Sequence, residues 1–505
     1  MKSKLPLLLL GLLSCATLPA AQPAPVTPSA PVIGWGDQGD GTYRNPILKA
    51  DYSDPDVIRV GDDFYLVASE FHFIGIQVLH SRDLVNWRII GQVFPRLPID
   101  PKYDEMRAYA QGTWAPTLRF RNGTFYLYVC TPQDGLFMWH TRNPAGAWSE
   151  MVTVKAVANW EDPCPFWDED GQAYLVHGRK GAGPLIIHKM NAEGTQLLDE
   201  GVEVYRGPVA EGPKVFRRHG WYYISLPEGG VEVGGQVLLR SRQLYGPYEK
   251  RQVLVDGSPH QGALVDLENG ETWFVAFKST GHLGRVTHLL PVRWGEDDWP
   301  VFGDAGRTVA QAKKPTLPGG PILRPQTDDE FSTPVLGPQW QWNHNPDPAA
   351  WSLVERPGWL RLRGLPAPEL KLARNTLTQK LWGDAGTFEA RLDVTHLAEG
   401  QKAGVAFMSG NVFGPIGVMR VGGRLVIEVE GAKGPELKQS TVWLRGTYVG
   451  DVGRLAYSLD GSTWTELGAP VTLKFGQWKG ARVTLYCYGA GDGHADIGEV
   501  RYRYQ

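Results

Sequence analysis

Alternating apolar and polar positions, broken by short turns, dominate the first three hundred residues of the chain. The stretch DPCPFWDEDGQAYLV, which begins at Asp162, predicts a strand, a tight turn and a second strand. The stretch DPDVIRVGDDFYLV, which begins at Asp54, has the same design. An acid followed by proline therefore stands at the head of two similar predicted hairpins.

This unit recurs five times. Each copy has a polar or aromatic lead residue, an apolar strand, a turn that usually contains glycine, and an aromatic strand. The lead residues are Asp54, Trp114, Asp162, Glu211 and His260, at intervals of 60, 48, 49 and 49 residues. Five β-rich units of this length predict a five-bladed β-propeller. Coincidental hairpins in a β-sandwich are the alternative.

The last third of the chain has short alternating runs, such as GTFEARLDV from Gly386, which favour an antiparallel β-sandwich. Two stretches rich in proline and glycine separate the parts. We therefore expect an all-β chain with a linker at 22–41, a propeller at 42–312, a second linker at 313–329 and a sandwich at 330–505.

The N-terminus has two lysines, then an apolar run and small residues, which predicts a signal peptide over 1–21. The sequence LLSC also resembles a bacterial lipoprotein cleavage site, which would leave a lipidated Cys15. Cleavage near Ala20 or Ala21 is the alternative. Either form predicts an exported protein, which would be periplasmic, anchored at the cell surface or secreted. No later apolar run is long enough to cross a membrane.

Composition narrows the functional classes. The chain of 505 residues has a formal net charge of −3 and no long basic run, which argues against a nucleic-acid partner. Apart from Cys15, three widely spaced cysteines remain, and they form neither a disulfide framework nor a metal-ligand spacing. We expect them to pack as small apolar residues.

Candidate chemistry follows from the repeat. The innermost strand of each propeller blade lines a central channel, so the five lead residues should converge there. Burying several carboxyl groups for stability alone is unfavourable, and a functional pocket is the better interpretation than five separate turn residues. Carboxyl groups around a small pocket suit glycoside hydrolysis, in which one acid protonates the leaving oxygen and another carboxylate activates water or attacks the sugar. Trp114 would offer a flat face to a sugar ring.

At these residues the sequence resembles glycoside hydrolase family 43, whose members are inverting five-bladed propeller enzymes acting mostly on xylosides and arabinosides. The resemblance is carried by NPIL from Asn45, SDPD from Ser53, GTWAPTL from Gly112, DP with DEDG after Asp162, EGPK from Glu211 and GRVTHLLPVRW from Gly284. The C-terminal part, with WQWNHN from Trp340 and YSLDG from Tyr457, resembles the concanavalin-like sandwich of the β-xylosidase-like branch.

The resemblance implies specific roles. Asp54 would be the general base, Glu211 the general acid, and Asp162 the group that orients Glu211 and tunes its acidity. Four further residues match positions around the sugar, namely Phe71, Trp114, His260 and Arg285. An inverting mechanism also implies carboxyl groups roughly 6.5–9.5 Å apart and a bell-shaped dependence of rate on pH.

The expected function is therefore removal of terminal β-D-xylosyl residues from xylo-oligosaccharides or hemicellulose. Cleavage of α-L-arabinofuranosides is the alternative within the enzyme class, and a non-catalytic sugar-binding propeller is the alternative outside it. The partner would be a pentose-containing oligosaccharide or polysaccharide. The reaction needs no cofactor, although some family members hold a central ion, so a structural calcium ion near His260 stays open. The sandwich would either bind polysaccharide or supply a loop to the rim of the pocket, and the oligomeric state is open.

Overall fold

The structure is a computed structural model that describes residues 34–255, 259–430 and 432–505. The predicted signal peptide, Cys15 and most of the predicted linker 22–41 lie outside the described residues. Within these ranges the structure has no helix that is both long and apolar enough to span a membrane.

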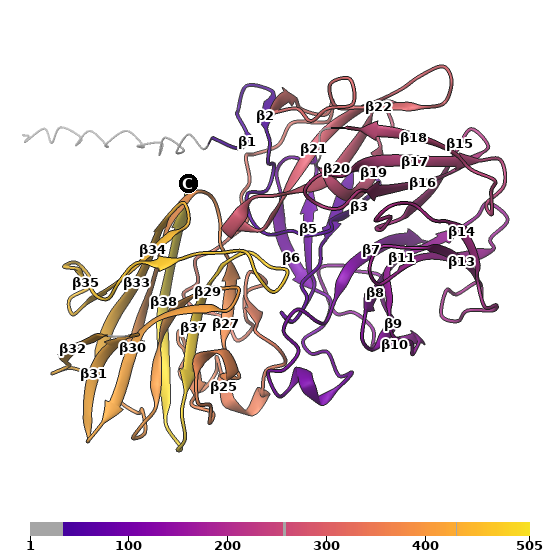
Figure 1. Ribbon diagram of the computed structural model, residues 1–505. Coiled ribbons are helices and arrows are strands. Elements are labelled where there is room, and N and C mark those ends of the chain that lie inside the picture. The colour runs from indigo at the N-terminus through magenta and orange to yellow at the C-terminus, as the bar shows by residue number, and fades with distance from the viewer. Residues whose placement is uncertain (1–33, 256–258, 431) are drawn as a thin grey trace, which may run out of the picture. The chain divides into compact units, whose positions relative to one another are not determined.

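Five four-stranded antiparallel sheets, each built from four consecutive strands, form the first part of the described chain (Figure 1). Their strands are β3 Asp56–Val60, β4 Asp63–Val67, β5 Gln77–Ser81 and β6 Arg88–Gln92; β7 Trp114–Arg121, β8 Thr124–Thr131, β9 Gly135–Thr141 and β10 Val152–Lys155; β11 Trp160–Trp167, β12 Ala173–Arg179, β13 Leu185–Met190 and β14 Val202–Tyr205; β15 Lys214–Arg218, β16 Trp221–Glu228, β17 Gly235–Ser241 and β18 Glu249–Leu254; β19 His260–Asp266, β20 Thr272–Ser279, β21 Arg285–Trp294 and β22 Pro300–Phe302. Each predicted lead residue stands close to the start of the first strand of one sheet, and Asp162 lies just inside β11.

These five sheets close into a ring. Strands β3, β7, β11 and β15 contact one another in succession, β19 contacts the fourth sheet through β16, and β3 contacts both β7 and β19. A small sheet joins the two ends of this part of the chain, because β2 (Thr42–Arg44) pairs with both β1 (Gly36–Asp37) and β23 (Gln311–Lys313). The predicted propeller architecture is confirmed.

Local sequence explains the hairpins. The turn between β3 and β4 contains Gly61 with a φ of +61°, a left-handed conformation that costs glycine little. Along β4 and β8, aromatic residues fill the space between neighbouring sheets, where Tyr65 and Phe125 pack edge to face at 4.9 Å. The glycine in the turn and the aromatic residues along the strands thus both agree with the hairpins predicted from the sequence.

Two larger antiparallel sheets form the β-sandwich that was predicted for the last third of the chain. The seven-stranded sheet has the order β24 (Gln341–Trp342), β27 (Leu377–Lys380), β37 (Arg482–Tyr488), β29 (Lys402–Ser409), β30 (Val412–Val421), β31 (Arg424–Val429) and β32 (Ala432–Glu436). The eight-stranded sheet has the order β25 (Trp351–Ser352), β26 (Leu360–Arg363), β38 (His494–Tyr504), β28 (Ala385–Asp393), β33 (Thr441–Val449), β34 (Val452–Ser458) and β35 (Thr465–Glu466), and β36 (Val471–Thr472) also pairs with β34. Short 3₁₀ helices are η1 Pro101–Tyr103, η2 Gly281–Leu283, η3 Pro348–Ala350 and η4 Leu370–Leu372.

A buried group of charges joins the propeller to the sandwich. The carboxylate of Glu70 accepts hydrogen bonds from Lys380 at 2.7 and 2.8 Å and from Arg482 at 2.9 Å. Lys479 lies 2.8 Å from Asp51, and all five side chains are at most 2% exposed. Buried charges are tolerable only when they are paired, so these contacts hold the two β-structures in one arrangement.

Two further predictions from the sequence concern the cysteines and the domain boundaries. The three described cysteines, Cys130, Cys164 and Cys487, are free and buried, as expected. The predicted domain boundaries, 42–312 and 330–505 with a linker between them, stay predictions.

Candidate active site

The five innermost strands do not present the predicted lead residues at one equivalent position. Backbone pairing aligns Trp114 with Cys130, Glu161 with Gly178 and His260 with Phe277, each just before a break in register. By the same pairing Ser53 faces Ser69, and Glu211 faces Pro227. The equivalent residues are therefore Ser53, Trp114, Glu161, Glu211 and His260.

The residue after each of these five positions has a left-handed backbone. These residues are Asp54 (φ 54°), Ala115 (36°), Asp162 (56°), Gly212 (58°) and Gln261 (43°). A residue of this kind in a β-bulge changes the direction of its side chain relative to regular alternation. The prediction that Asp54 and Asp162 are equivalent to Glu211 is wrong by one residue. Asp54 and Asp162 occupy the bulge position that follows the position of Glu211. Two of the five residues at this bulge position are therefore acids.

Asp54 lies among hydrogen-bond donors. Its Oδ2 accepts hydrogen bonds from the hydroxyls of Ser69 at 2.6 Å and Ser53 at 3.3 Å. Its Oδ1 accepts one from Nη1 of Arg285 at 3.2 Å. Only 6% of Asp54 is exposed. The arginine and the two hydroxyls around this one carboxyl group fix its orientation.

A second group of acids lies across the ring. One oxygen each from Glu161, Asp162 and Glu211 lies within 4.8 Å of the others. Asp162 accepts a hydrogen bond from the backbone N–H of Gly212 at 2.7 Å, and Glu161 accepts one from the N–H of Ala182 at 2.9 Å. The structure thus brings the predicted Asp162 and Glu211 together and adds a third acid to them.

Burial and mutual repulsion shift the titration of this cluster. Burial, followed by the charges of Glu161, Glu211 and Asp54, raises the pKa of Asp162 well above its ordinary value. Burial, followed by the charge of Glu211, raises the pKa of Glu161 to about 7. Asp162 and Glu161 therefore hold protons at pH values where an exposed carboxyl group would be ionised.

His260 lies directly against this cluster. Its Nε2 is 2.8 Å from Oε1 of Glu211, and its ring packs near Phe277 with centroids 5.4 Å apart. The histidine is 3% exposed, whereas the Glu211 side chain is 23% exposed. Glu211 is thus held at one oxygen, and part of its side chain stays accessible to solvent.

Aromatic residues form one wall of the site. Phe71 and Trp114 pack edge to face at 5.4 Å, and Trp478 lies 6.0 Å from Trp114. Trp478 belongs to the sandwich, in the loop between β36 and β37, and is 45% exposed. The sandwich therefore supplies a loop to the rim, which is one of the two roles considered for it from sequence.

Arg285 connects Asp54 to the aromatic residues of the sandwich loop. Besides contacting Asp54, its Nη1 donates to Ser53 at 2.8 Å. Its guanidinium lies 5.7 Å from the ring of Trp478 and 5.8 Å from that of Phe475. The predicted residues Asp54, Arg285, Trp114 and Phe71 thus form one connected wall.

Three residues of the site were not predicted from the sequence, namely Glu161, Ser69 and Trp478. Glu161 directly precedes Asp162, and a second acid beside a predicted site acid was the signal that could have revealed it. Ser69 and Trp478 had no such signal, because their proximity to Asp54 and Trp114 depends on how distant strands and loops meet.

The acid cluster could hold either protons or a cation. Three carboxyl groups offer up to six oxygen ligands, and calcium takes about six to eight, some of which can be carbonyl or water oxygens. Next to the cluster, Nε2 of His260 already contacts Glu211. Glu161, Asp162 and Glu211 are therefore the described residues that could hold a cation beside His260.

A carboxylate surrounded by donors, opposite carboxyl groups that retain protons, is the arrangement that glycoside hydrolases use to cleave glycosidic bonds. Comparison with known proteins agrees. The model of glycosyl hydrolases family 43 matches residues 43–300, and that of the β-xylosidase C-terminal concanavalin A-like domain matches residues 328–503. The chain belongs to glycoside hydrolase family 43.

Named relatives include both activities expected from sequence. The chain is 48% identical to a putative β-xylosidase of Xylanibacter ruminicola, over 89% of this chain and 87% of the relative. It is 36% identical to a non-reducing end α-L-arabinofuranosidase of Bacteroides ovatus, over 64% of this chain and 65% of the relative. The crystal structure of a xylan β-1,4-xylosidase from Bacillus halodurans C-125 superposes with a TM-score of 0.81 at 25% identity, covering 91% of this chain and 99% of that one.

Proposed function

We propose that this protein is an inverting, exo-acting glycoside hydrolase that removes terminal β-D-xylosyl residues from xylo-oligosaccharides or hemicellulose. One observation carries the catalytic part of the proposal, namely the contrast between the two acid groups. Asp54 is surrounded by donors from Arg285, Ser53 and Ser69. Asp162 and Glu161, beside Glu211, have raised pKa values.

In the proposed reaction Asp54 acts as the general base and Glu211 as the general acid. Asp54 takes a proton from a water molecule, whose oxygen forms a bond to the anomeric carbon. The bond from that carbon to the leaving oxygen breaks, and the leaving oxygen takes the proton of Glu211. Attack from the face opposite to the leaving group inverts the anomeric configuration.

The other predicted residues position these two. His260 holds Oε1 of Glu211, and Asp162 lies against the same acid with its own oxygen fixed by Gly212. Arg285 holds Asp54 and leaves guanidinium nitrogens for sugar hydroxyls. Trp114 and Phe71 provide an aromatic wall for the terminal sugar, since flat apolar faces suit the C–H faces of a pyranose ring.

Exo action is supported by the sandwich loop that reaches the site. Phe475 and Trp478 reach from the sandwich to Arg285 and Trp114. A rim on that side favours a pocket that admits a chain end over an open groove that admits a chain interior.

The β-xyloside is favoured over the α-L-arabinofuranoside by the higher identity to the Xylanibacter ruminicola relative. The arabinofuranoside remains the second candidate. Loss of one of the acids would be the signature of a non-catalytic sugar-binding propeller, whereas Asp54, Asp162 and Glu211 are all present.

The test is hydrolysis of nitrophenyl β-D-xyloside and nitrophenyl α-L-arabinofuranoside by the wild type and by Glu211→Ala. We expect turnover of the xyloside to exceed that of the arabinofuranoside, and turnover to collapse in a folded Glu211→Ala protein. A folded wild type that hydrolyses neither substrate would overturn the proposal in favour of a binding propeller.

We also propose that the protein is exported through its N-terminal signal, either as a lipoprotein at Cys15 or after cleavage near Ala20 or Ala21. The two lysines, the apolar run and the small residues of 1–21 support this. Metabolic labelling with palmitate of the wild type and of Cys15→Ala distinguishes the two forms.

A further inference from the structure

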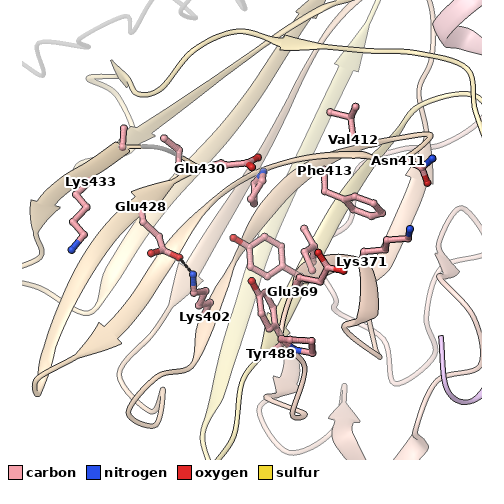
Figure 2. A pocket seen from close by; sticks show the side chains of 16 residues that line it. Glu369, Lys371, Lys402, Asn411, Val412, Phe413, Glu428, Glu430, Lys433 and Tyr488 are labelled. Carbon is pink, nitrogen blue, oxygen red and sulfur yellow. Dashed lines mark ion pairs between the residues drawn. The ribbon is translucent and has the colours of Figure 1, made fainter. Parts of the chain in front are cut away.

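A large hollow lies on the seven-stranded sheet of the sandwich and is built without any propeller residue. Its volume is about 780 Å³, and its lining residues run from Pro368 to Tyr488. Small-ligand sites have volumes of roughly 300–1,000 Å³. Figure 2 shows the lining side chains across this sheet, among them Phe413, Tyr488 and the ion pair between Lys402 and Glu428.

The hollow is on the face of the sheet that is turned away from the sandwich core. Along β37, Val483, Leu485 and Cys487 belong to the main hydrophobic core, whereas Tyr486 and Tyr488 pack in a separate small cluster. Side chains alternate between faces along a strand, so the two tyrosines point to the opposite side. The second cluster contains Phe413 as well.

Two glycines make room for the side chain of Tyr486, which lines the hollow. Strand register places Tyr486 beside Gly404, Gly404 beside Gly417, and Gly417 beside Glu428, which forms one row across four strands. A Cβ atom at Gly404 or Gly417 would lie 2.7 or 2.3 Å from the hydroxyl oxygen of Tyr486. The Tyr486 side chain therefore lies over both glycines, where any side chain would displace it.

The Tyr486 hydroxyl is an unpaired polar group at this site. The residue is 3% exposed and lines the hollow, and its hydroxyl makes no hydrogen bond with any described residue. The hydroxyl is not among the fully enclosed atoms of the described residues, so it is accessible from the hollow. It can hydrogen-bond to a ligand that carries hydroxyl groups.

The charges of the hollow select a neutral ligand. Three glutamates and three lysines line it, namely Glu369, Glu428, Glu430, Lys371, Lys402 and Lys433. Equal numbers of opposite charges favour neither a polyanion nor a polycation, whereas carboxylates, ammonium groups and the amide of Asn411 can all hydrogen-bond to sugar hydroxyls. The half-buried rings of Phe413 and Tyr488 add apolar faces on which sugar rings stack.

We propose that this hollow is a second carbohydrate-binding site, separate from the propeller channel, that binds a stretch of xylan chain. The choice of xylan rests on the proposed function, because a site for the polymer on the same chain would raise the local concentration of ends for the propeller. The hollow lies outside the matched catalytic region 43–300.

The test is affinity electrophoresis in gels with and without soluble xylan, with Glu211→Gln as the parent so that the polysaccharide is not degraded. An exo-acting propeller binds only chain ends, which are few in a long polymer, so retardation reports mainly on internal chain binding. Tyr488→Ala and Phe413→Ala are introduced separately into this parent. Tyr245→Ala, which removes a 37% exposed tyrosine from the propeller surface, is the matched control. Thermal unfolding verifies that each variant is folded.

We expect xylan to retard the parent and the Tyr245→Ala control equally, and the dissociation constant to rise at least fivefold in both hollow variants. Retardation of folded Tyr488→Ala and Phe413→Ala equal to that of the parent would overturn the proposal. So would a parent that xylan does not retard, or one that is retarded in a parallel gel with arabinan and not in the gel with xylan. Failure of the proposed function appears separately, as absence of nitrophenyl β-D-xyloside hydrolysis by the wild type, a reaction that does not require the hollow.

Discussion

Lys479 of the sandwich lies 2.8 Å from the backbone carbonyl oxygen of Ser69, whose hydroxyl in turn donates to Asp54 at 2.6 Å. The same ammonium group pairs with Asp51 at 2.8 Å. Burial alone would raise the pKa of Asp51, and the charges of Lys479 and Lys380 hold it below its usual value. A sandwich residue thus supports the strand end that positions the proposed general base.

We therefore expect Lys479→Met to impair both stability and catalysis. Removing one partner from a buried ion pair leaves the other charge uncompensated, at a cost of about 3–5 kcal/mol. Loss of the contact to Ser69 should lower kcat about tenfold or more at a temperature where the variant is folded. Denaturant unfolding and steady-state kinetics measure the two effects.

The matched control is Lys49→Met, which breaks a second contact between propeller and sandwich. Its partner Asp384 is 69% exposed, so this pair should contribute about 1 kcal/mol or less and leave kcat unchanged. Equal effects of the two substitutions would contradict the proposed role of Lys479.

The proposed roles of Asp54 and Glu211 predict different responses to the leaving group. A poor leaving group needs a proton in the transition state, whereas dinitrophenolate needs almost none. We expect Glu211→Ala to lose at least 10²-fold more activity on xylobiose than on dinitrophenyl β-D-xyloside. Asp54→Ala should lose similar activity on both, because water activation is required in either case. A uniform loss in Glu211→Ala would argue against the acid assignment.

The stereochemistry of the first product tests the mechanism independently. Activation of water by Asp54 should release α-xylose from a β-xyloside, before mutarotation mixes the anomers. Proton NMR in the first minutes of a reaction at high enzyme concentration resolves the two anomeric signals. Initial release of β-xylose would indicate a covalent intermediate and would rule out the proposed role of Asp54.

The raised pKa of Glu161 predicts a specific dependence of the free energy of unfolding on pH. Burial and the charge of Glu211 raise its pKa from 4.5 to about 7, so the folded protein binds this proton more tightly than the unfolded chain. The free energy of unfolding should therefore fall as pH rises from about 4.5 to about 7 and lose nothing more from this group above that range. Glu161→Gln cannot ionise and should gain up to about 3 kcal/mol relative to the wild type across this interval.

Urea unfolding at pH 5 and pH 8 measures this difference. Glu169→Gln, in which a 77% exposed side chain is replaced, should show no comparable change between the two pH values. A Glu161→Gln protein whose stability follows that of the wild type at both pH values would contradict the raised pKa.

Trp478 is predicted to act in substrate binding rather than in the chemical step. Its ring lies 6.0 Å from Trp114 and 5.7 Å from the guanidinium of Arg285, at the rim and away from the acids. We expect Trp478→Ala to raise KM for xylobiose about tenfold with a smaller change in kcat. Trp464→Ala, which removes a sandwich tryptophan stacked on Arg445, serves as the control. A loss confined to kcat would contradict a binding role.

Much of the architecture followed from patterns that act locally. Alternating residues and glycine turns determine hairpins, and a repeat near fifty residues determines that the hairpins form similar sheets in a ring. Asp54, Asp162 and Glu211 could be found in this way, because each stands where a strand enters the centre of the ring. The sandwich was recognisable for the same reason, since alternation along strands does not depend on distant contacts.

Tertiary structure alone decided the arrangement of the side chains. A left-handed residue at the start of each innermost strand moves Asp54 and Asp162 one position away from Glu211 in register and brings Glu161 into the cluster. The repeat spacing could not reveal this, because a bulge of one residue changes a side chain's direction while leaving a fifty-residue interval almost unaltered. The contacts of Lys479 with Ser69 and of Trp478 with Trp114 join residues more than three hundred positions apart. They arise from the packing of the sandwich on the propeller, which the pattern along a single strand does not encode.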